Sequence, residues 1–163
     1  MGDGLVTVVL AGGWLLQVAA WLVALGRAGR TAAAPGEWLR EASIRAAMLA
    51  LVVWALAAPR APWPGPVGYG ALLVFLAGQA LAVVARRQLG AAWGMGVQPR
   101  PGAARVRRGL YAVLGHPIYL GMLLAALAQW LTLRNLPSAL LAAGTGAVAG
   151  VKAWWETRSL GPR

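Results

Sequence analysis

The sequence predicts an all-α integral membrane protein in which five helices cross the bilayer. Of its 163 residues, 60% are hydrophobic and only 12% are charged, whereas soluble domains are about half apolar and about a quarter charged. The net charge is +11, but the basic residues lie in gaps between apolar runs, as they do in membrane proteins. No polar domain is left to carry a nucleic-acid surface. We therefore expect one membrane domain over residues 1–163 and no nucleic-acid partner.

Three apolar segments in the first half of the chain each predict a membrane span. Residues 5–25 are uncharged and have about the ~20 residues that a helix needs to cross a bilayer. The second span, 44–58, is short, and Pro35 and Glu37 indicate that its helix begins earlier, in the headgroup region. A proline-rich turn then leads into the third span, 67–85.

The last two spans form a predicted hairpin. Residues 117–133 and 136–151 are apolar, and only Arg134 and Asn135 separate them. So short a connection requires the two helices to be antiparallel neighbours. The basic segment 86–116 and the tail 152–163 then emerge on the same side of the membrane.

The basic residues predict the orientation of the chain. With five spans, 13 of the 15 Lys and Arg fall on one side, and only Arg60 and Arg134 fall on the other. Positively charged loops are retained in the cytoplasm. We therefore expect a multi-pass protein of the cell membrane with its N-terminus outside and its C-terminus in the cytoplasm.

Several classes of site are not expected. The chain has no cysteine, one histidine and four acidic residues, which supply no plausible metal-ligand set. The glycine pairs Gly12-Gly13 and Gly146/Gly150 are interpreted as helix-packing positions. The glutamines within the spans are interpreted as interhelical hydrogen-bonding residues; they are Gln17, Gln79 and Gln129.

The single histidine is the main candidate for function. His116 lies 18 residues before Arg134, and Ala153 lies 18 residues after Asn135, with Glu156 one turn further on. Residues equally distant from a hairpin turn emerge at one face, so His116 and Glu156 are expected to meet at the inner membrane surface. The residues alone leave two interpretations open: a ligand-binding pair, or a histidine that caps its helix beside a solvated glutamate.

A motif around this histidine resembles a known family. The pattern is Gly109-x-Tyr111-x-Val113-x-x-His116-Pro117-Ile118-Tyr119-Leu120-Gly121, preceded by Leu89-Gly90-x-x-Trp93 and followed after the hairpin by Glu156-x-x-x-Leu160. Over about residues 80–160 it resembles the isoprenylcysteine carboxyl methyltransferase family, a broad group that includes bacterial relatives and phospholipid N-methyltransferases.

The resemblance implies a membrane-embedded methyltransferase that uses S-adenosyl-L-methionine. It also implies a lipophilic acceptor, with a prenylcysteine-type carboxylate as one candidate, while the sequence leaves the acceptor open. The residues it assigns to the cofactor pocket are Gly109, Tyr111, His116, Pro117, Tyr119, Gly121 and Glu156.

The chain also departs from the family pattern. Leu110 replaces a proline, Ala112 and Gly115 replace two arginines, and Trp155 replaces the first of two glutamates; the chain stops at Arg163, before a Gly-x-x-Tyr segment of the pattern. Without the two arginines, the candidates for positioning an acceptor are Arg100, Arg107 and Arg108, and no catalytic residue is assigned. The alternative function is a non-catalytic five-helix relative that acts as a partner or assembly subunit.

Overall fold

The described part of the chain is entirely helical. The computed structural model describes residues 3–28, 35–59, 65–90 and 108–160, and within them it contains no strand. The helices are α1 (Asp3–Ala28), α2 (Pro35–Ala57), α3 (Pro66–Leu89), the short α4 (Leu110–Val113), α5 (Pro117–Leu133) and α6 (Leu136–Leu160).

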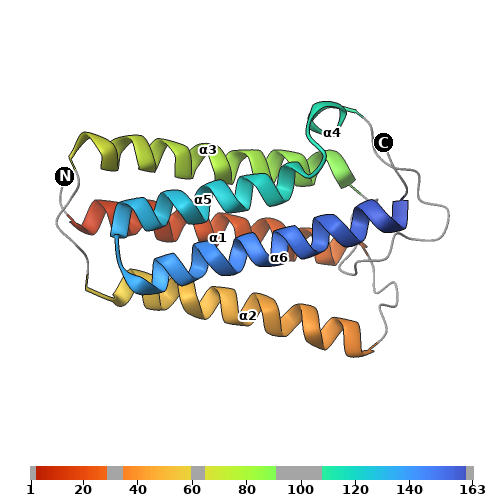
Figure 1. The fold of residues 1–163 in the computed structure, drawn as a ribbon, viewed down its shortest axis with the longest axis horizontal. Coiled ribbons are helices and arrows are strands. Elements are labelled where there is room, and N and C mark those ends of the chain that lie inside the picture. Colours follow the sequence, from red (N-terminus) through yellow and green to blue (C-terminus); the bar gives the residue numbers. More distant parts are fainter. Residues whose placement is uncertain (1–2, 29–34, 60–64, 91–107, 161–163) are drawn as a thin grey trace.

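The five long helices lie side by side along one direction (Figure 1). In this view α3 and α2 form opposite edges, and α1, α5 and α6 lie between them. The end of the bundle that carries α4 and the last turns of α6 is called the α4 end here. The opposite end carries the turn between α5 and α6.

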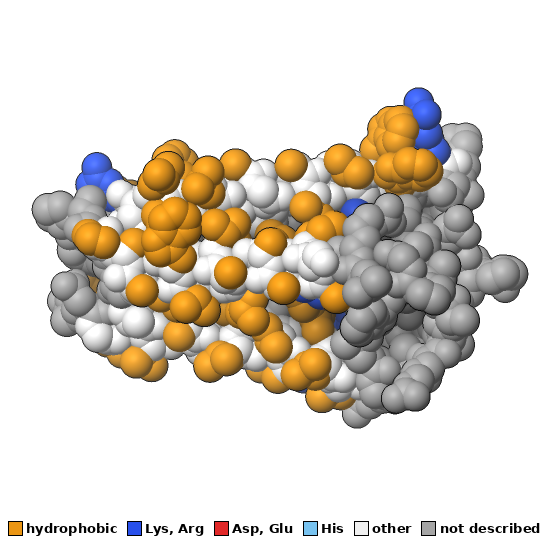
Figure 2. All heavy atoms as spheres, turned by 90° about the horizontal axis from the view of Figure 1, so that it is seen from below, with side chains coloured by type: hydrophobic (Ala, Val, Ile, Leu, Met, Phe, Trp, Pro, Cys, Tyr) orange, Lys and Arg blue, Asp and Glu red, His pale blue; other side chains and the backbone are white. Residues whose placement is uncertain are grey.

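The helices match the apolar segments of the sequence. Three are long and apolar enough to cross a membrane, over Gly4–Val23, Pro66–Leu89 and Leu136–Trp155, and two shorter apolar helices cover Ala42–Ala57 and Pro117–Leu133. Hydrophobic side chains extend along the length of the face shown in Figure 2, and the most prominent Lys and Arg side chains lie at its two ends. A surface this apolar identifies a membrane protein.

The closest helix contact joins α3 and α5 through two glycines. A Cβ atom built on Gly121 would lie 2.6 Å from the carbonyl oxygen of Gly78 and 2.7 Å from the amide nitrogen of Ala82. A Cβ on Gly78 would in turn lie 2.7 Å from the Gly121 carbonyl oxygen. Neither position can hold a side chain without separating the helices, which is the use that membrane helices make of small residues.

This contact corrects one interpretation of the sequence. Gly146 meets only the tip of Leu123, at 3.6 Å, and a Cβ on Gly150 meets nothing within 4 Å among the described residues. The pair Gly146/Gly150 therefore does not form a close helix crossing. Of the other pair, Gly13 packs tightly under the Phe75 ring, and Gly12 faces open space in the described structure.

The α5–α6 hairpin turns over two residues, as predicted. Arg134 adopts the left-handed conformation (φ 51°, ψ 40°) that ends α5. The Asn135 side chain then caps α6, because its Oδ1 accepts a hydrogen bond from the Ser138 amide at 3.0 Å. Its Nδ2 donates to the Ala55 carbonyl at 2.9 Å. One side chain thus begins α6 and fixes the hairpin to the last turn of α2.

The interior contains buried glutamines from three helices. The indole nitrogen of Trp14 donates a hydrogen bond to Oε1 of Gln129, which joins α1 to α5 as predicted. Gln17 and Gln79 are also buried, but Gln17 Oε1 and Gln79 Nε2 have no hydrogen-bond partner among the described residues. Within the described part of the chain, the structure thus confirms the predicted interhelical hydrogen bond for Gln129.

The glycine contact predicts a sharp difference between two glycine substitutions. We expect Gly121→Ala to lower the stability of the detergent-solubilised protein by about 1–3 kcal/mol, because the added methyl forces α3 and α5 apart. Gly144→Ala is the control, since its Cβ meets nothing within 4 Å. Thermal unfolding followed by tryptophan fluorescence measures both. Equal melting temperatures for the two variants would contradict this account of the α3–α5 contact.

Candidate functional site

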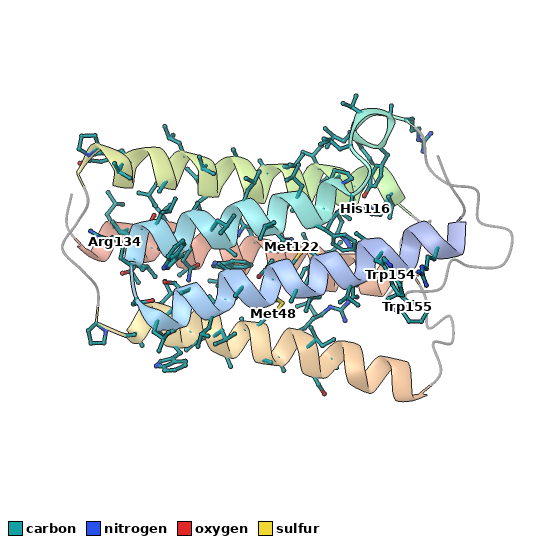
Figure 3. The ribbon with its side chains drawn as sticks, in the orientation of Figure 1. Met48, His116, Met122, Arg134, Trp154 and Trp155 are labelled. Atoms are coloured by element: carbon teal, nitrogen blue, oxygen red, sulfur yellow. The ribbon has the colours of Figure 1, made fainter. Side chains whose placement is uncertain are left out.

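The motif residues gather at the α4 end of the bundle. His116 precedes α5, and Trp154 and Trp155 lie in the last turns of α6 at the same end (Figure 3). Glu156 follows Trp155 in α6. The hairpin count therefore brings the backbone of both predicted residues to one end of the molecule; the side chain of Glu156 lies outside the described residues.

Gln88 fixes α4 against the end of α3. Its Oε1 accepts a hydrogen bond from the backbone amide of Leu110, the first residue of α4, at 2.8 Å. Gly109, just before α4, has a positive φ of 57° and lies so close that a Cβ would be 2.6 Å from Gln88 Oε1. Only glycine satisfies both conditions without strain. Gly109 therefore has a clear structural role, which is to hold Tyr111 near the end of α3.

His116 stacks on an aromatic ring at the start of α5. Pro117 is buried and occupies the first turn of the helix, where a missing amide hydrogen costs nothing. His116 is the residue before it, yet its side chain makes no capping hydrogen bond. Its imidazole instead stacks on Tyr119 with 5.7 Å between ring centroids and 19° between planes. His116 therefore occupies the N-cap position of α5, but its side chain does not supply the cap.

The last turns of α6 add aromatic and cationic groups to this end. Trp154 and Trp155 meet edge to face at 5.5 Å. The guanidinium of Arg158 lies 4.0 Å from the centre of the Trp154 ring, which is a close cation–π contact. Half of each tryptophan side chain remains exposed. These rings are suited to the interface between bilayer and water.

Arg86 is a residue at this end of the bundle that the sequence motifs do not single out. It is 5% exposed, whereas Arg87 beside it is exposed. A signal was available, because Arg86 lies seven residues after Gln79 and therefore on the same buried face of α3. The adjacent arginines instead suggested a solvated end to the span.

The predicted site residues thus divide by environment. Tyr111, His116 and Tyr119 are half-buried at the α4 end. Gly121 is buried in the α3–α5 contact and Pro117 in the start of α5, so both have packing roles. Of the acceptor-positioning candidates, Arg108 is exposed, and Arg100 and Arg107 lie outside the described residues.

The Gln88 contact predicts local loosening of α4. We expect Gln88→Ala to increase hydrogen exchange of the Leu110 amide about fivefold, since a backbone hydrogen bond worth about 1 kcal/mol loses its acceptor. Arg87→Ala is the matched control on the neighbouring residue and should leave exchange unchanged. Exchange mass spectrometry of a peptide that covers α4 makes the comparison. Identical exchange in both variants would remove Gln88 from this role.

Comparison with known proteins agrees with the motif. Residues 71–148 match the model of the Isoprenylcysteine carboxyl methyltransferase (ICMT) family. The match runs from α3 through α4 and α5 into α6, and it ends before Glu156. No curated protein and no solved structure matches the chain. The resemblance of the chain to the isoprenylcysteine carboxyl methyltransferase family is therefore confirmed over residues 71–148.

Proposed function

We propose that the protein is a membrane-embedded methyltransferase that uses S-adenosyl-L-methionine and modifies a lipophilic acceptor. The observation that carries the proposal is the arrangement at the α4 end, where the family motif residues Tyr111, His116 and Tyr119 come to the end of the bundle that α6 also reaches. A prenylcysteine-type carboxylate is one acceptor that fits the family.

The side chains at this end suit the chemistry of the cofactor. When bound, S-adenosyl-L-methionine supplies a methyl group on a positively charged sulfur. The stacked pair of His116 and Tyr119 offers an aromatic face, which attracts a sulfonium by cation–π interaction. His116 can donate a hydrogen bond to a carboxylate, and the Glu156 carboxylate can accept one from an ammonium group.

The residues at the α4 end would contribute to catalysis mainly by positioning the cofactor and the acceptor. Methyl transfer is an in-line displacement, and an ionised carboxylate acceptor needs no general base, so alignment of the two reactants accounts for most of the rate. Gln88 and Gly109 hold Tyr111, and the buried Pro117 fixes the start of α5 beside His116. A lipophilic acceptor could reach this end from within the bilayer.

The cofactor proposal predicts the effects of two substitutions. We expect His116→Ala and Glu156→Gln each to weaken binding of S-adenosyl-L-methionine about tenfold or more, because each removes a hydrogen bond to a charged group. Asp3→Asn is the control; it changes an acid at the opposite end of the bundle. Isothermal titration calorimetry in detergent gives the affinities. A wild-type protein that binds no cofactor, or variants that bind it equally well, would favour the non-catalytic relative.

The proposal includes five spans, with the N-terminus outside and the α4 end in the cytoplasm of the cell. This orientation follows from the charge asymmetry of the loops. The two shorter spans are α2 and α5.

This orientation can be read from cysteine labelling, because the chain has no cysteine of its own. Arg134→Cys and Arg108→Cys place one exposed thiol at each end of the bundle, at the α5–α6 turn and just before α4. In intact cells we expect a membrane-impermeant maleimide to label position 134 only, and to label position 108 after permeabilisation. The reverse pattern, or labelling of both in intact cells, would contradict the proposed topology.

A further inference from the structure

We infer that α4 and the adjoining end of α3 form a docking surface for the anionic phospholipid headgroups of the surrounding bilayer. The surface consists of Arg87, Arg108, Ala112 and Val113, and it is called the α4 surface here. Its partner is the membrane around the protein and not the methyl acceptor, so the α4 surface goes beyond the proposed function.

The helix α4 receives little stabilisation from burial. It has four residues, and none of them is buried. Isolated helices need about 12–15 residues to be even marginally stable in water, and most helices in proteins depend on tertiary packing. One hydrogen bond, from the amide of Leu110 to Oε1 of Gln88, links α4 to α3 at 2.8 Å. Most of the surface of α4 is therefore left for a partner outside the bundle.

α4 lies at the perimeter of the bundle, where a membrane span ends. In Figure 1 it lies on the outer side of α3, beyond the five long helices. Gln88, which contacts Gly109 and Leu110, is the residue before the last one of α3, and the uncharged part of this helix stops at Arg86. The charged ends of membrane spans lie among the lipid headgroups. The contact with Gln88 therefore holds α4 at the depth of the headgroups.

Val113 gives the α4 surface an apolar tip. Its side chain is 79% exposed, which is more than any other exposed large hydrophobic side chain of the described residues. Ala112 beside it is exposed as well. An apolar side chain on a short helix at the membrane surface is stabilised when it enters the boundary between headgroups and acyl chains. Val113 is therefore suited to anchor α4 in this boundary.

Two exposed arginines accompany the apolar tip. Arg108 precedes Gly109 and Arg87 precedes Gln88, and because Gly109 packs against Gln88, both arginines lie at the contact between α4 and α3. Neither α3 nor α4 contains an acidic residue. A guanidinium matches the oxygens of a phosphate group, and each one adds to the attraction for an anionic membrane surface. The charge of the α4 surface therefore favours anionic over zwitterionic lipids.

The α4 surface shares its short helix with one residue of the proposed cofactor site. Tyr111 is the second residue of α4, between Leu110 and Ala112. Lipid headgroups that hold Arg108 and Val113 in place also limit the movement of Tyr111. The α4 surface therefore connects the composition of the bilayer with the site, and it gives Arg108 a role other than positioning an acceptor.

The test measures hydrogen exchange of α4 in membranes of two compositions. The full-length protein is placed, without cofactor, in nanodiscs of phosphatidylcholine alone or of an equimolar mixture of phosphatidylcholine and phosphatidylglycerol. Exchange mass spectrometry follows a peptide that covers α4. We expect its amides to exchange about fivefold or more slowly in the anionic nanodiscs, and high salt should reduce the difference. Equal exchange in the two membranes overturns the inference.

Substitutions separate the charged part of the α4 surface from its apolar part. Arg108→Gln should reduce the difference between the two membranes, and Arg87→Gln should act in the same direction. Val113→Ser should speed the exchange of α4 in both membranes, because it removes the apolar anchor. Arg134→Gln and Val67→Ser are the matched controls; they make the same changes at exposed positions of the opposite end and should leave α4 unchanged. The inference is overturned if the variants at 108 and 134 behave alike.

Two conditions without anionic lipid provide further controls. In a non-ionic detergent, Arg87→Ala should leave the exchange of α4 unchanged, as in its comparison with Gln88→Ala. In phosphatidylcholine nanodiscs, added glycerol phosphate should not slow the exchange, because a soluble anion lacks the charged surface and the acyl boundary of a bilayer. If glycerol phosphate slows the exchange as much as phosphatidylglycerol does, α4 binds a soluble phosphate ester and the inference is overturned.

Cofactor calorimetry in the same nanodiscs separates this inference from the proposed function. Slower exchange of α4 in anionic nanodiscs, without binding of S-adenosyl-L-methionine, would support the α4 surface and contradict the methyltransferase proposal. Cofactor binding with equal exchange in the two membranes would overturn the α4 surface and leave the methyltransferase proposal in place.

Discussion

The contact of α3 with α5 through Gly78 and Gly121 governs the position of everything else in the site. Because neither glycine has a side chain, the two backbones approach until carbonyl and amide groups of one helix meet the Cα of the other. The end of α3 and the start of α5 are thereby held at the same end of the bundle. Arg86 and Gln88 of one helix and His116 beside the other depend on this approach.

Two side chains, Gln88 and Asn135, and the α5–α6 hairpin hold the other elements of the site in place. Gln88 accepts a hydrogen bond from the first amide of α4 and holds this short helix at the end of α3. Asn135 caps α6 and bonds to α2 at the opposite end, which returns α6 toward the α4 end. The functional region therefore combines elements that are distant in sequence and that a few side-chain hydrogen bonds hold in place.

Much of the fold was predictable because the bilayer imposes a simple rule on the sequence. An apolar run long enough to cross the hydrocarbon must be helical, since all of its backbone groups need partners. The predicted apolar segments and the predicted two-residue hairpin therefore lie close to the helices and the turn that the structure shows. Helix packing was less predictable from the sequence. The sequence does not distinguish a glycine at a tight helix crossing, such as Gly121, from one that faces open space in the described structure, such as Gly150.

The sequence by itself determined that the chain is helical, that its surface is apolar, that it resembles a methyltransferase family, and that His116 and α6 share one end. Hydropathy, motif and hairpin length are local properties, so no tertiary structure was needed for them. Helix periodicity places Arg86 on the same face of α3 as Gln79, but the tertiary structure decided that this face is the buried one. Arg86 and Arg87 are adjacent and identical in chemistry, and only the direction of α3 relative to its neighbours distinguishes them.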